Sequence, residues 1–395
     1  MKIAVLSLVF DNYGTRLQSY ALCKVLGRIV GDKASVEVVN MDTPWTGTKN
    51  LSKKKLIVSS LTEYGPLLGI RHIYEMFRWR RERRIAEARG SSIMMERRSS
   101  LFNLVNSLIP YTMEKYTVED IRAGAIDFYD AFLVGSDQVW NGIKVPNQDI
   151  FLLNFAKNKP KLSYAASFGM TTIPEKMKSI YSEGIKYFDS LLLREDEGVK
   201  LCKELGRKDA HKVLDPTLLL DIEEYEDVMD SEIPEIQGKY VLVYSLNQSY
   251  KIYSETYKMC KKYGYKMVVL KRSFVPPFID NMENSIELFA VSPGGFLSLI
   301  KKAECVVTNS YHALLFSINA KTPFYLYLNN IDEENSRLLT VCKMCSLEKR
   351  VFYETQKLPV EIGMIDYASV HEILLRERKK SIQLLENSIC KYILR

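Results

Sequence analysis

The sequence contains no apolar run near the roughly 20 residues that a helix needs to span a bilayer. Its opening residues, Met-Lys-Ile-Ala-Val-Leu, provide no long apolar segment and no cleavage site, so we expect no secretory signal and a cytoplasmic protein. The cysteines number seven in 395 residues, and an odd, scattered set argues against a disulfide framework. No internal repeat and no Gly-x-Gly-x-x-Gly fingerprint is present.

Metal ligands are equally sparse. Cys342 and Cys345 form a lone Cys-x-x-Cys, and neither a second pair nor a nearby histidine completes a zinc set. We therefore predict no metal and no cofactor, with these two cysteines packed on a helix. The net charge of +7 is too modest for a nucleic-acid binder and suits anionic small substrates or an anionic membrane surface.

The chain has the composition of an ordinary globular protein. Hydrophobic residues make up 47% and charged residues 26%, which excludes global disorder. A length of 395 residues predicts two domains of roughly 150–200 residues each. Pro216 and the acidic stretch 221–236, followed by Gly238, predict the change of domain.

Strand and helix patterns alternate on both sides of this boundary. Residues 2–8 and 35–41 are apolar strands separated by a helical pattern, which predicts a right-handed βαβ unit. Further strands are expected at 129–134, 161–167, 190–194, 240–246, 266–270, 304–308 and 324–328, with helices at 174–187, 195–205, 250–263, 293–302, 311–320 and 368–391. The pattern predicts two doubly wound domains with ligands at the carboxyl ends of their strands, facing a shared cleft.

Two polar loops follow strands in the first half. Gly14 in Asp-Asn-Tyr-Gly-Thr-Arg permits close approach of a ligand to the start of a helix, although a plain strand–helix turn explains these residues equally well. The loop 135–141, Gly-Ser-Asp-Gln-Val-Trp-Asn, has the mixture of groups typical of a sugar-binding or catalytic loop. Asp137 there would orient or deprotonate a hydroxyl, or else cap a helix.

Two more loops carry charged or titratable side chains. Arg194 ends an apolar strand, where it would hold a carboxylate or phosphate, or pair with Glu195 or Asp196. His312 is the one of four histidines at a strand-to-helix junction, where an imidazole can serve as acid or base near neutral pH. A structural histidine is the alternative.

Taken in order, these loops resemble the polysaccharide pyruvyltransferase family. The resemblance rests on Asn12-Tyr13-Gly14, on Gly135-Ser136-Asp137-Gln138 and on Asn309-Ser310-Tyr311-His312, and runs through most of the chain. The matching stretches are 12–14, 17–22, 129–141, 163–169, 194–195, 214–218, 308–312, 316–318 and 335–337.

The resemblance implies a glycosyltransferase-B-like arrangement of two Rossmann-like domains. Residues 1–236 would form the acceptor-side domain, with a basic helical insert at about 50–110, and residues 237–365 the donor-side domain. Residues 366–395 would form a terminal helix packing back on the first domain. The implied reaction transfers a pyruvyl group from phosphoenolpyruvate to two hydroxyls of a hexose, with no cofactor, and leaves a cyclic ketal and phosphate.

The resemblance also assigns roles to individual residues. His312 would be the catalytic acid, and Asp137 the base or the group that orients the acceptor. The donor's anionic groups would be held by Arg194, Lys271, Arg272, Asn309, Ser310 and Arg337. The acceptor sugar would be held by Asn12, Tyr13, Gly14, Arg16, Gln18, Ser136, Gln138, Trp140 and Asn141.

One position departs from the family pattern. Several branches have arginine two residues before the histidine, whereas this chain has Ser310. Either another cation such as Arg16 or Arg272 substitutes, or the donor differs.

The stretch 71–98 contains nine arginines and four glutamates interleaved with Phe77 and Trp79. It would rest on anionic lipid at the inner membrane surface, near an acceptor sugar carried on polyprenyl diphosphate, or pack as a solvated helix on its own domain. Three functions remain open: the pyruvyl transferase, a nucleotide-sugar glycosyltransferase of the same fold, and a non-catalytic carbohydrate-binding relative.

Overall fold

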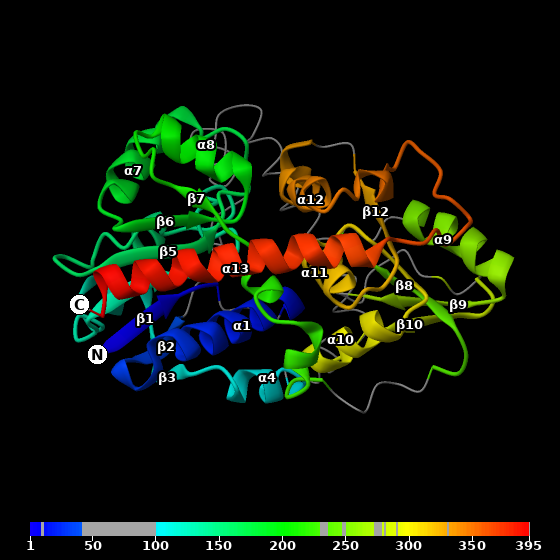
Figure 1. The fold of residues 1–395 in the computed structure, drawn as a ribbon, viewed down its shortest axis with the longest axis horizontal. Helices are drawn as coiled ribbons and strands as arrows, with labels where there is room; N and C mark the ends of the chain where they lie inside the picture. Colours follow the sequence, from blue (N-terminus) through cyan, green and yellow to red (C-terminus); the bar gives the residue numbers. More distant parts are fainter. Residues whose placement is uncertain are drawn as a thin grey trace, which may run out of the picture.

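The computed structural model describes residues 1–8, 12–41, 100–229, 236–246, 250–271, 279, 282–289, 291–329 and 332–394. The basic stretch 71–98 and Arg272 lie outside these residues. The described chain forms two parallel sheets, one of seven strands and one of six. This architecture confirms the predicted α/β class with two Rossmann-like domains (Figure 1).

The N-terminal sheet has the strand order β3-β2-β1-β4-β5-β6-β7. Its strands are β1 (Lys2–Leu6), β2 (Ser35–Met41), β3 (Tyr111–Tyr116), β4 (Ala131–Val134), β5 (Lys161–Ala166), β6 (Ser190–Leu193) and β7 (His211–Lys212). The direction of winding reverses between β1 and β4, which therefore flank the crevice where an open parallel sheet binds its ligand.

The C-terminal sheet has the order β10-β9-β8-β11-β12-β13, with its own reversal between β8 and β11. Its strands are β8 (Tyr240–Tyr244), β9 (Lys266–Leu270), β10 (Ser285–Leu288), β11 (Cys305–Thr308), β12 (Phe324–Leu328) and β13 (Val351–Tyr353). The central strands β4 and β8 are buried along their whole length, as their uninterrupted apolar sequences predict.

Helices cover both faces of each sheet. They are α1 (Tyr13–Val30), α4 (Asn103–Ser107), α5 (Val118–Arg122), α6 (Gln148–Phe151), α7 (Glu175–Lys186), α8 (Asp196–Glu204), α9 (Tyr250–Tyr263), α10 (Pro293–Lys302), α11 (Tyr311–Asn319), α12 (Asp332–Met344) and α13 (Tyr367–Tyr392). Cys342 is buried on α12 and Cys345 just after it, which confirms the packing role predicted for the pair.

The strands place alternate side chains in separate cores. Ala4 and Leu6 of β1 face a core formed with α5–α8, whereas Ile3 and Val5 face a second core on the α1 side. This second core is continuous with side chains of the C-terminal sheet such as Leu242 and with helices α10, α11 and α13. One apolar core is thus shared by the two domains, and each domain also has a core of its own.

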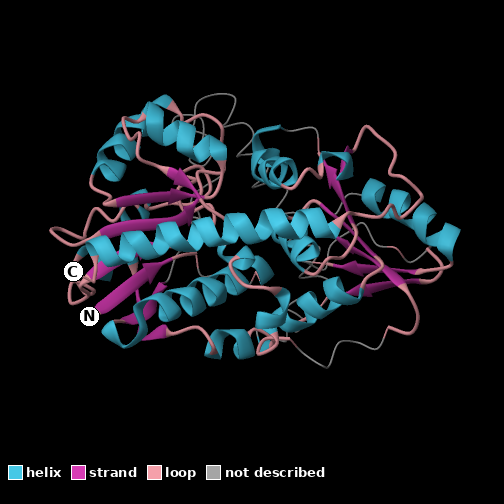
Figure 2. Cartoon of the chain, viewed as in Figure 1, coloured by secondary structure: helices cyan, strands magenta, loops and turns pink. Residues whose placement is uncertain are grey.

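The long helix α13 runs past both sheets (Figures 1 and 2). At its start the Tyr367 hydroxyl donates to the carbonyl of Thr322 in the C-terminal domain. Near its end the hydroxyls of Ser388 and Ser190 lie 2.8 Å apart, which joins the helix to β6 of the N-terminal sheet. One helix therefore connects the outer parts of both domains.

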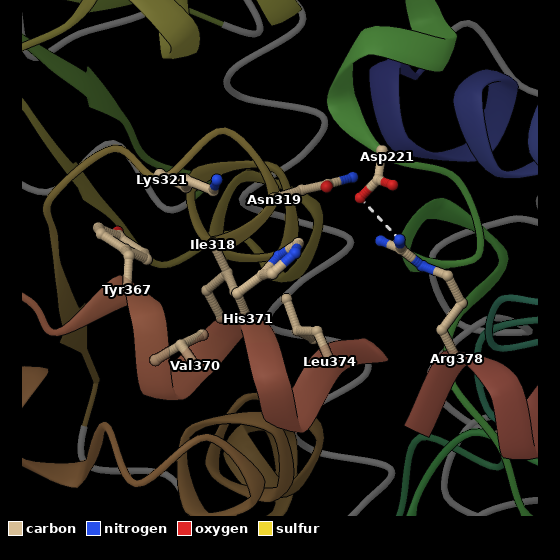
Figure 3. A pocket seen from close by; sticks show the side chains of 9 residues that line it. All are labelled: Asp221, Ile318, Asn319, Lys321, Tyr367, Val370, His371, Leu374 and Arg378. Carbon is tan, nitrogen blue, oxygen red and sulfur yellow. Dashed lines mark hydrogen bonds and ion pairs between the residues drawn. The ribbon is translucent and has the colours of Figure 1, made fainter. Parts of the chain in front are cut away.

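Between these ends α13 holds the segment that links the sheets. Arg378 Nε donates to the carbonyl of Leu218 over 2.7 Å, and its Nη atoms donate to the Leu220 carbonyl over 3.3 Å and to Asp221 Oδ1 over 2.6 Å. Figure 3 shows the pair of Arg378 and Asp221 beside a hollow between α13 and the end of α11. The described crossing from one domain to the other is therefore hydrogen-bonded to the terminal helix.

Candidate active site between the two domains

The four polar loops singled out in the sequence meet between the domains. Three of them follow β1, β4 and β6 of the N-terminal sheet, and the fourth follows β11 of the C-terminal sheet. Thr15 Oγ1 of α1 donates to Asp137 Oδ2 over 3.2 Å, and Arg194 Nη2 lies 3.5 Å from Asp137 Oδ1. His312 of α11 packs against Gly14 of α1. Residues separated by about 300 positions in the chain thus line one site.

Asp137 is the most accessible carboxylate of this group, with its side chain 16% exposed. Its backbone is left-handed (φ 79°), and Oδ1 accepts from the backbone N–H of Gln138 over 2.8 Å. The residues directly after Asp137 form turns and not a helix, so the alternative that Asp137 caps a helix is wrong. Burial opposes ionisation, but the charges of Arg194, His312 and Arg337 prevail and hold the pKa of this carboxyl below its ordinary value.

Arg194 is completely buried among carboxylates. Its Nη1 donates to Asp215 Oδ2 over 3.1 Å, while Nη2 lies 3.5 Å from Asp137 and Nε 3.8 Å from Glu195. The guanidinium carbon stands 4.6 Å from the ring centre of Tyr311. Burial opposes its charge, yet these anionic and aromatic neighbours outweigh burial and raise the pKa of Arg194. The predicted pair with Glu195 is present, and two further carboxylates join it.

His312 sits in the first turn of α11, where the Ser310 hydroxyl caps the helix by accepting from the Ala313 N–H over 3.5 Å. A β-carbon at Gly14 would come within 2.0 Å of Nδ1, so the imidazole lies directly on the α1 backbone. Its Nε2 is buried, lies 3.9 Å from Asp215 Oδ2, and has no hydrogen-bond partner among the described residues.

The charge on His312 is set by opposing neighbours. Burial is the largest influence and lowers the pKa of the imidazole, while Asp215 and Asp137 raise it. Arg194 and Arg337 lower it again, and the net result lies below the ordinary value. The lowered pKa favours the neutral imidazole, and protonation of the ring depends on which neighbouring charges are present.

Arg337 of α12 brings a second guanidinium to the same place. Its carbon Cζ is 5.6 Å from the ring centre of Tyr311, and its Nε is buried without a partner among the described residues. The Gln138 amide, with its oxygen turned toward Arg337, accepts from both Nη atoms over 3.1 Å. Burial and the nearby Arg194 lower the pKa of Arg337. Two guanidinium groups thus face one aromatic ring, an arrangement that favours an anion between or beside them.

Two basic residues expected at the site have partners elsewhere. The Arg16 guanidinium donates to the Tyr111 hydroxyl of β3, at the outer edge of the sheet. Lys271 is fully buried, with Nζ 3.3 Å from Glu287 Oε1 of β10. Neither contact involves His312 or the residues around it.

The side chains of Asn309 and Trp140 also form hydrogen bonds with other residues of the chain. The Asn309 amide accepts from the Leu246 N–H over 2.7 Å and donates to Ser245 Oγ over 3.1 Å, which fastens the loop after β8 to that after β11. The Trp140 indole is fully buried and donates to the Phe151 carbonyl over 2.9 Å. Trp140 therefore supports the 135–141 loop from the core side.

Of the other predicted acceptor-binding residues, Tyr13 and Gln18 are buried on α1, and Asn12 precedes the helix. Asn12 caps the helix by accepting from the Gly14 N–H over 2.9 Å. The Tyr13 ring is stacked on Phe296 of the other domain, with ring centres 4.7 Å apart. Gln18 is buried, and neither atom of its amide has a hydrogen-bond partner among the described residues. Asn141, on the β4 loop, receives the Lys144 N–H over 3.1 Å.

The site also contains residues that the sequence did not single out as functional. Asp215 and Glu195 add two buried carboxylates, and Tyr311 provides the ring on which both arginines lie. Asp215 follows β7, but that strand is two residues long and gives no recognisable apolar pattern. Within the described parts of the chain, no group of three or more His, Cys, Asp and Glu side chains could hold a metal ion.

Two parallel sheets whose polar loops meet at a site between the two domains define a glycosyltransferase-B-like protein. The sequence profile of the polysaccharide pyruvyl transferase family matches residues 12–331. The chain belongs to this family, and it is a transferase.

Solved structures are similar in fold at low sequence identity. UDP-GlcNAc 2-epimerase from Methanocaldococcus jannaschii aligns with a TM-score of 0.51 at 9% identity, over 95% of this chain and 92% of that one. The E. coli ADP-heptose lps heptosyltransferase II aligns with a TM-score of 0.40 at 11% identity, over 95% and 99%. No curated protein sequence matches the chain. None of the described helices is both long and apolar enough to cross a membrane.

Proposed function

We propose that the protein transfers the pyruvyl group of phosphoenolpyruvate onto two hydroxyls of a hexose in a cell-surface polysaccharide precursor. One observation carries the proposal: His312 of one domain and Asp137 of the other meet at a site with two guanidinium groups. An acid, an accepting carboxylate and a cation pair are the groups that such a transfer needs.

The chemistry balances without a cofactor. A proton adds to the methylene carbon of the donor, which becomes a methyl group, and the adjacent carbon becomes electrophilic. Two sugar oxygens bond to that carbon, the bond from carbon to the phosphate oxygen breaks, and phosphate leaves. Of the two hydroxyl protons, one replaces the proton given to the methylene carbon and the other leaves with phosphate. The product is a cyclic ketal that retains the pyruvyl carboxylate.

His312 is the proton donor and Asp137 orients the sugar hydroxyls. The imidazole is 12% exposed and the Asp137 carboxylate 16%, whereas Asp215 is fully buried, so the first two are the groups within reach of a substrate. The low pKa of Asp137 makes this carboxylate a weak base, which suits hydrogen bonding to a hydroxyl better than outright removal of its proton.

Arg337 is the donor-binding cation in this chain. Ser310 caps a helix and carries no charge, and Arg194 is enclosed by three carboxylates. Arg337 lies near Arg194, over the ring of Tyr311, and its Nε is without a partner among the described residues. The donor's carboxylate or phosphate would supply that partner.

The acceptor would be a sugar on a polyprenyl diphosphate carrier, presented at the cytoplasmic face of the membrane. The chemistry of such a carrier suits the nine arginines of the stretch 71–98. Vesicle sedimentation at low and high salt, with Arg80, Arg81, Arg83 and Arg84 changed to Glu, tests this part. Absence of binding by the unchanged protein at low salt would rule it out.

The donor is tested by thermal unfolding with phosphoenolpyruvate and, in parallel, with nucleotide sugars. A ligand at about 100 times its Kd stabilises the folded state by about 2.7 kcal/mol. We expect stabilisation by phosphoenolpyruvate that is reduced in Arg337→Gln. Arg194→Ala is unsuitable as the probe, because it would strand three buried carboxylates.

Stabilisation by a nucleotide sugar alone would replace the proposal with a glycosyltransferase of the same fold. The reaction itself is followed by release of phosphate that requires both phosphoenolpyruvate and an acceptor hexose. His312→Gln should abolish this release while leaving the circular dichroism spectrum unchanged. If His312→Gln retains full biological function, a non-catalytic carbohydrate-binding role would be favoured.

A further inference from the structure

Asp215 occupies a fixed position between the two domains. Its Oδ1 accepts from the backbone N–H of Thr217 over 3.0 Å and from the Thr217 hydroxyl over 2.8 Å. Its Oδ2 accepts from Arg194 Nη1 and from the Ser136 hydroxyl, each over 3.1 Å. Four donors therefore fix the orientation of this buried carboxylate.

The backbone around Asp215 is held as firmly as its side chain. The N–H of Leu214 donates to Ser381 Oγ of α13 over 2.9 Å, and Arg378 of the same helix binds the carbonyl of Leu218. The segment 214–218 thus has hydrogen bonds to α13 on both sides of the aspartate.

His312 faces this carboxylate from the other domain. Its buried Nε2 lies 3.9 Å from Asp215 Oδ2, and the opposite side of the ring rests on Gly14. The nitrogen on the Gly14 side is Nδ1. The imidazole is therefore enclosed between a fixed carboxylate at Nε2 and the α1 backbone at Nδ1.

We propose that Asp215 is the positioning residue of His312: its carboxylate faces Nε2, fixes the orientation and tautomer of the ring, and favours the protonated imidazole that supplies the proton for the substrate. The pairing stands on the geometry alone, and only its use in turnover rests on the proposed pyruvyl transfer. The arrangement follows the general logic in which a buried carboxylate selects the tautomer of an acid–base histidine.

The other groups around the imidazole do not replace Asp215. Asp137 is the second carboxylate near the ring, and it is bound to Thr15 and to the Gln138 N–H. Arg194 and Arg337 disfavour the protonated ring, and the edge of the uncharged Tyr311 ring lies against it. Removal of Asp215 therefore leaves two cations and one carboxylate facing His312.

The test is a titration of the imidazole by NMR in histidine-labelled protein without substrate. The chain has four histidines, so His312→Gln assigns the resonance. We expect Asp215→Asn to lower the pKa of His312 by about one unit or more. Ser136→Ala is the matched control: it removes a hydrogen bond to the same oxygen without changing the charge, and should shift the pKa by less than about 0.3 unit.

An unchanged titration of His312 in Asp215→Asn would overturn the proposal. If Asp215→Asn does not fold, the tautomer of neutral His312 in the wild-type protein is the test. We expect the proton on Nε2, and a neutral ring with its proton on Nδ1 would overturn the proposal.

Activity provides a separate readout. In Asp215→Asn we expect kcat to fall, while the KM for phosphoenolpyruvate changes less. In the pH profile of kcat, the decrease at alkaline pH should begin at a lower pH than in the wild type. A protein without any pyruvyl transfer would refute the proposed function and leave the titration of His312 a valid test of the pairing.

Discussion

The imidazole of His312 lies against the backbone of Gly14, and a β-carbon at position 14 would approach Nδ1 to 2.0 Å. Gly14 belongs to the regular helix α1, so the requirement for glycine at this position comes from space rather than from an unusual backbone angle. The contact joins a helix of the N-terminal domain to the first turn of α11. One absent methyl group thus lets the two domains form a common site.

We predict that Gly14→Ala displaces the imidazole and reduces turnover by about 100-fold, because misplacement by about 1 Å is enough for such a loss. Gly27→Ala is the matched control on the same helix, since a β-carbon there meets nothing within 4 Å. That control should keep full activity and unfold at a slightly higher urea concentration. Full activity in both variants would show that the ring moves aside without consequence.

A second prediction concerns donor binding. Arg337→Gln should weaken phosphoenolpyruvate binding by about 10-fold to 100-fold, the equivalent of one charge-assisted hydrogen bond of about 1.5–3 kcal/mol. Isothermal titration calorimetry measures the Kd. Lys343→Gln removes one exposed positive charge from the same helix and should leave the Kd within about twofold. An equal loss in both variants would indicate general electrostatic attraction only.

Asn309 should prove to be a structural residue. Asn309→Ala removes the acceptor of the Leu246 N–H and the donor to Ser245, which should lower the free energy of unfolding by about 1–3 kcal/mol. Urea denaturation measures the change, with exposed Asn154→Ala as the control. The KM for phosphoenolpyruvate should stay the same. A higher KM without loss of stability would instead support the donor-binding role predicted from the sequence.

The terminal helix allows a similar comparison. Arg378→Ala leaves the carbonyls of Leu218 and Leu220 and the carboxylate of Asp221 without this partner, and should cost about 2–3 kcal/mol of stability. Arg376→Ala, two positions earlier and exposed, should cost less than about 0.5 kcal/mol. Equal urea midpoints for the two variants would contradict a role for Arg378 in holding the linking segment.

The low pKa of Asp137 predicts an acid-sensitive contribution to stability. An acid whose folded-state pKa lies below the unfolded value of about 3.9 stabilises the fold above that pH, and the contribution is lost as the pH falls through the folded-state pKa. Asp137→Asn retains a residue type that tolerates a left-handed backbone. The gap in unfolding free energy between wild type and this variant should be largest near pH 6 and shrink toward pH 3.

The control for this pH dependence is exposed Asp32→Asn. Urea titrations at pH 6, 5, 4 and 3 should show a nearly constant, small difference for this variant. A difference that is equally constant for Asp137→Asn would mean that the ionic contacts of Asp137 add nothing to stability.

The sequence predicted the fold well where strands are central. β1, β4, β8 and β11 are buried on both faces, so their apolar runs are unbroken and easily recognised. The missed strands are β3, β7, β10 and β13, which all lie at sheet edges. Edge strands such as β3 (Tyr-Thr-Met-Glu-Lys-Tyr) carry exposed polar side chains, and β7 is only two residues long. Such segments leave little periodicity to detect.

The site was predicted in outline because its loops follow recognisable strands. Asp137, Arg194 and His312 all come directly after buried strands, and the structure brings them together. Glu195 was expected to pair with Arg194, but Asp215 was not recognised, because only three-dimensional contact shows that its carboxylate lies against Arg194. Likewise, the sequence shows that Arg16 is charged but not that Tyr111 binds it.

The apolar core shared by both sheets has a consequence for the molecule as a whole. Side chains of β1, α1, β8, α11 and α13 form one continuous cluster, so neither domain can be separated from the other without exposing it to water. The protein should therefore denature in one cooperative step, and each half expressed alone should aggregate. Any motion that admits a substrate must be a small sliding of packed helices rather than a wide swing of two independent lobes.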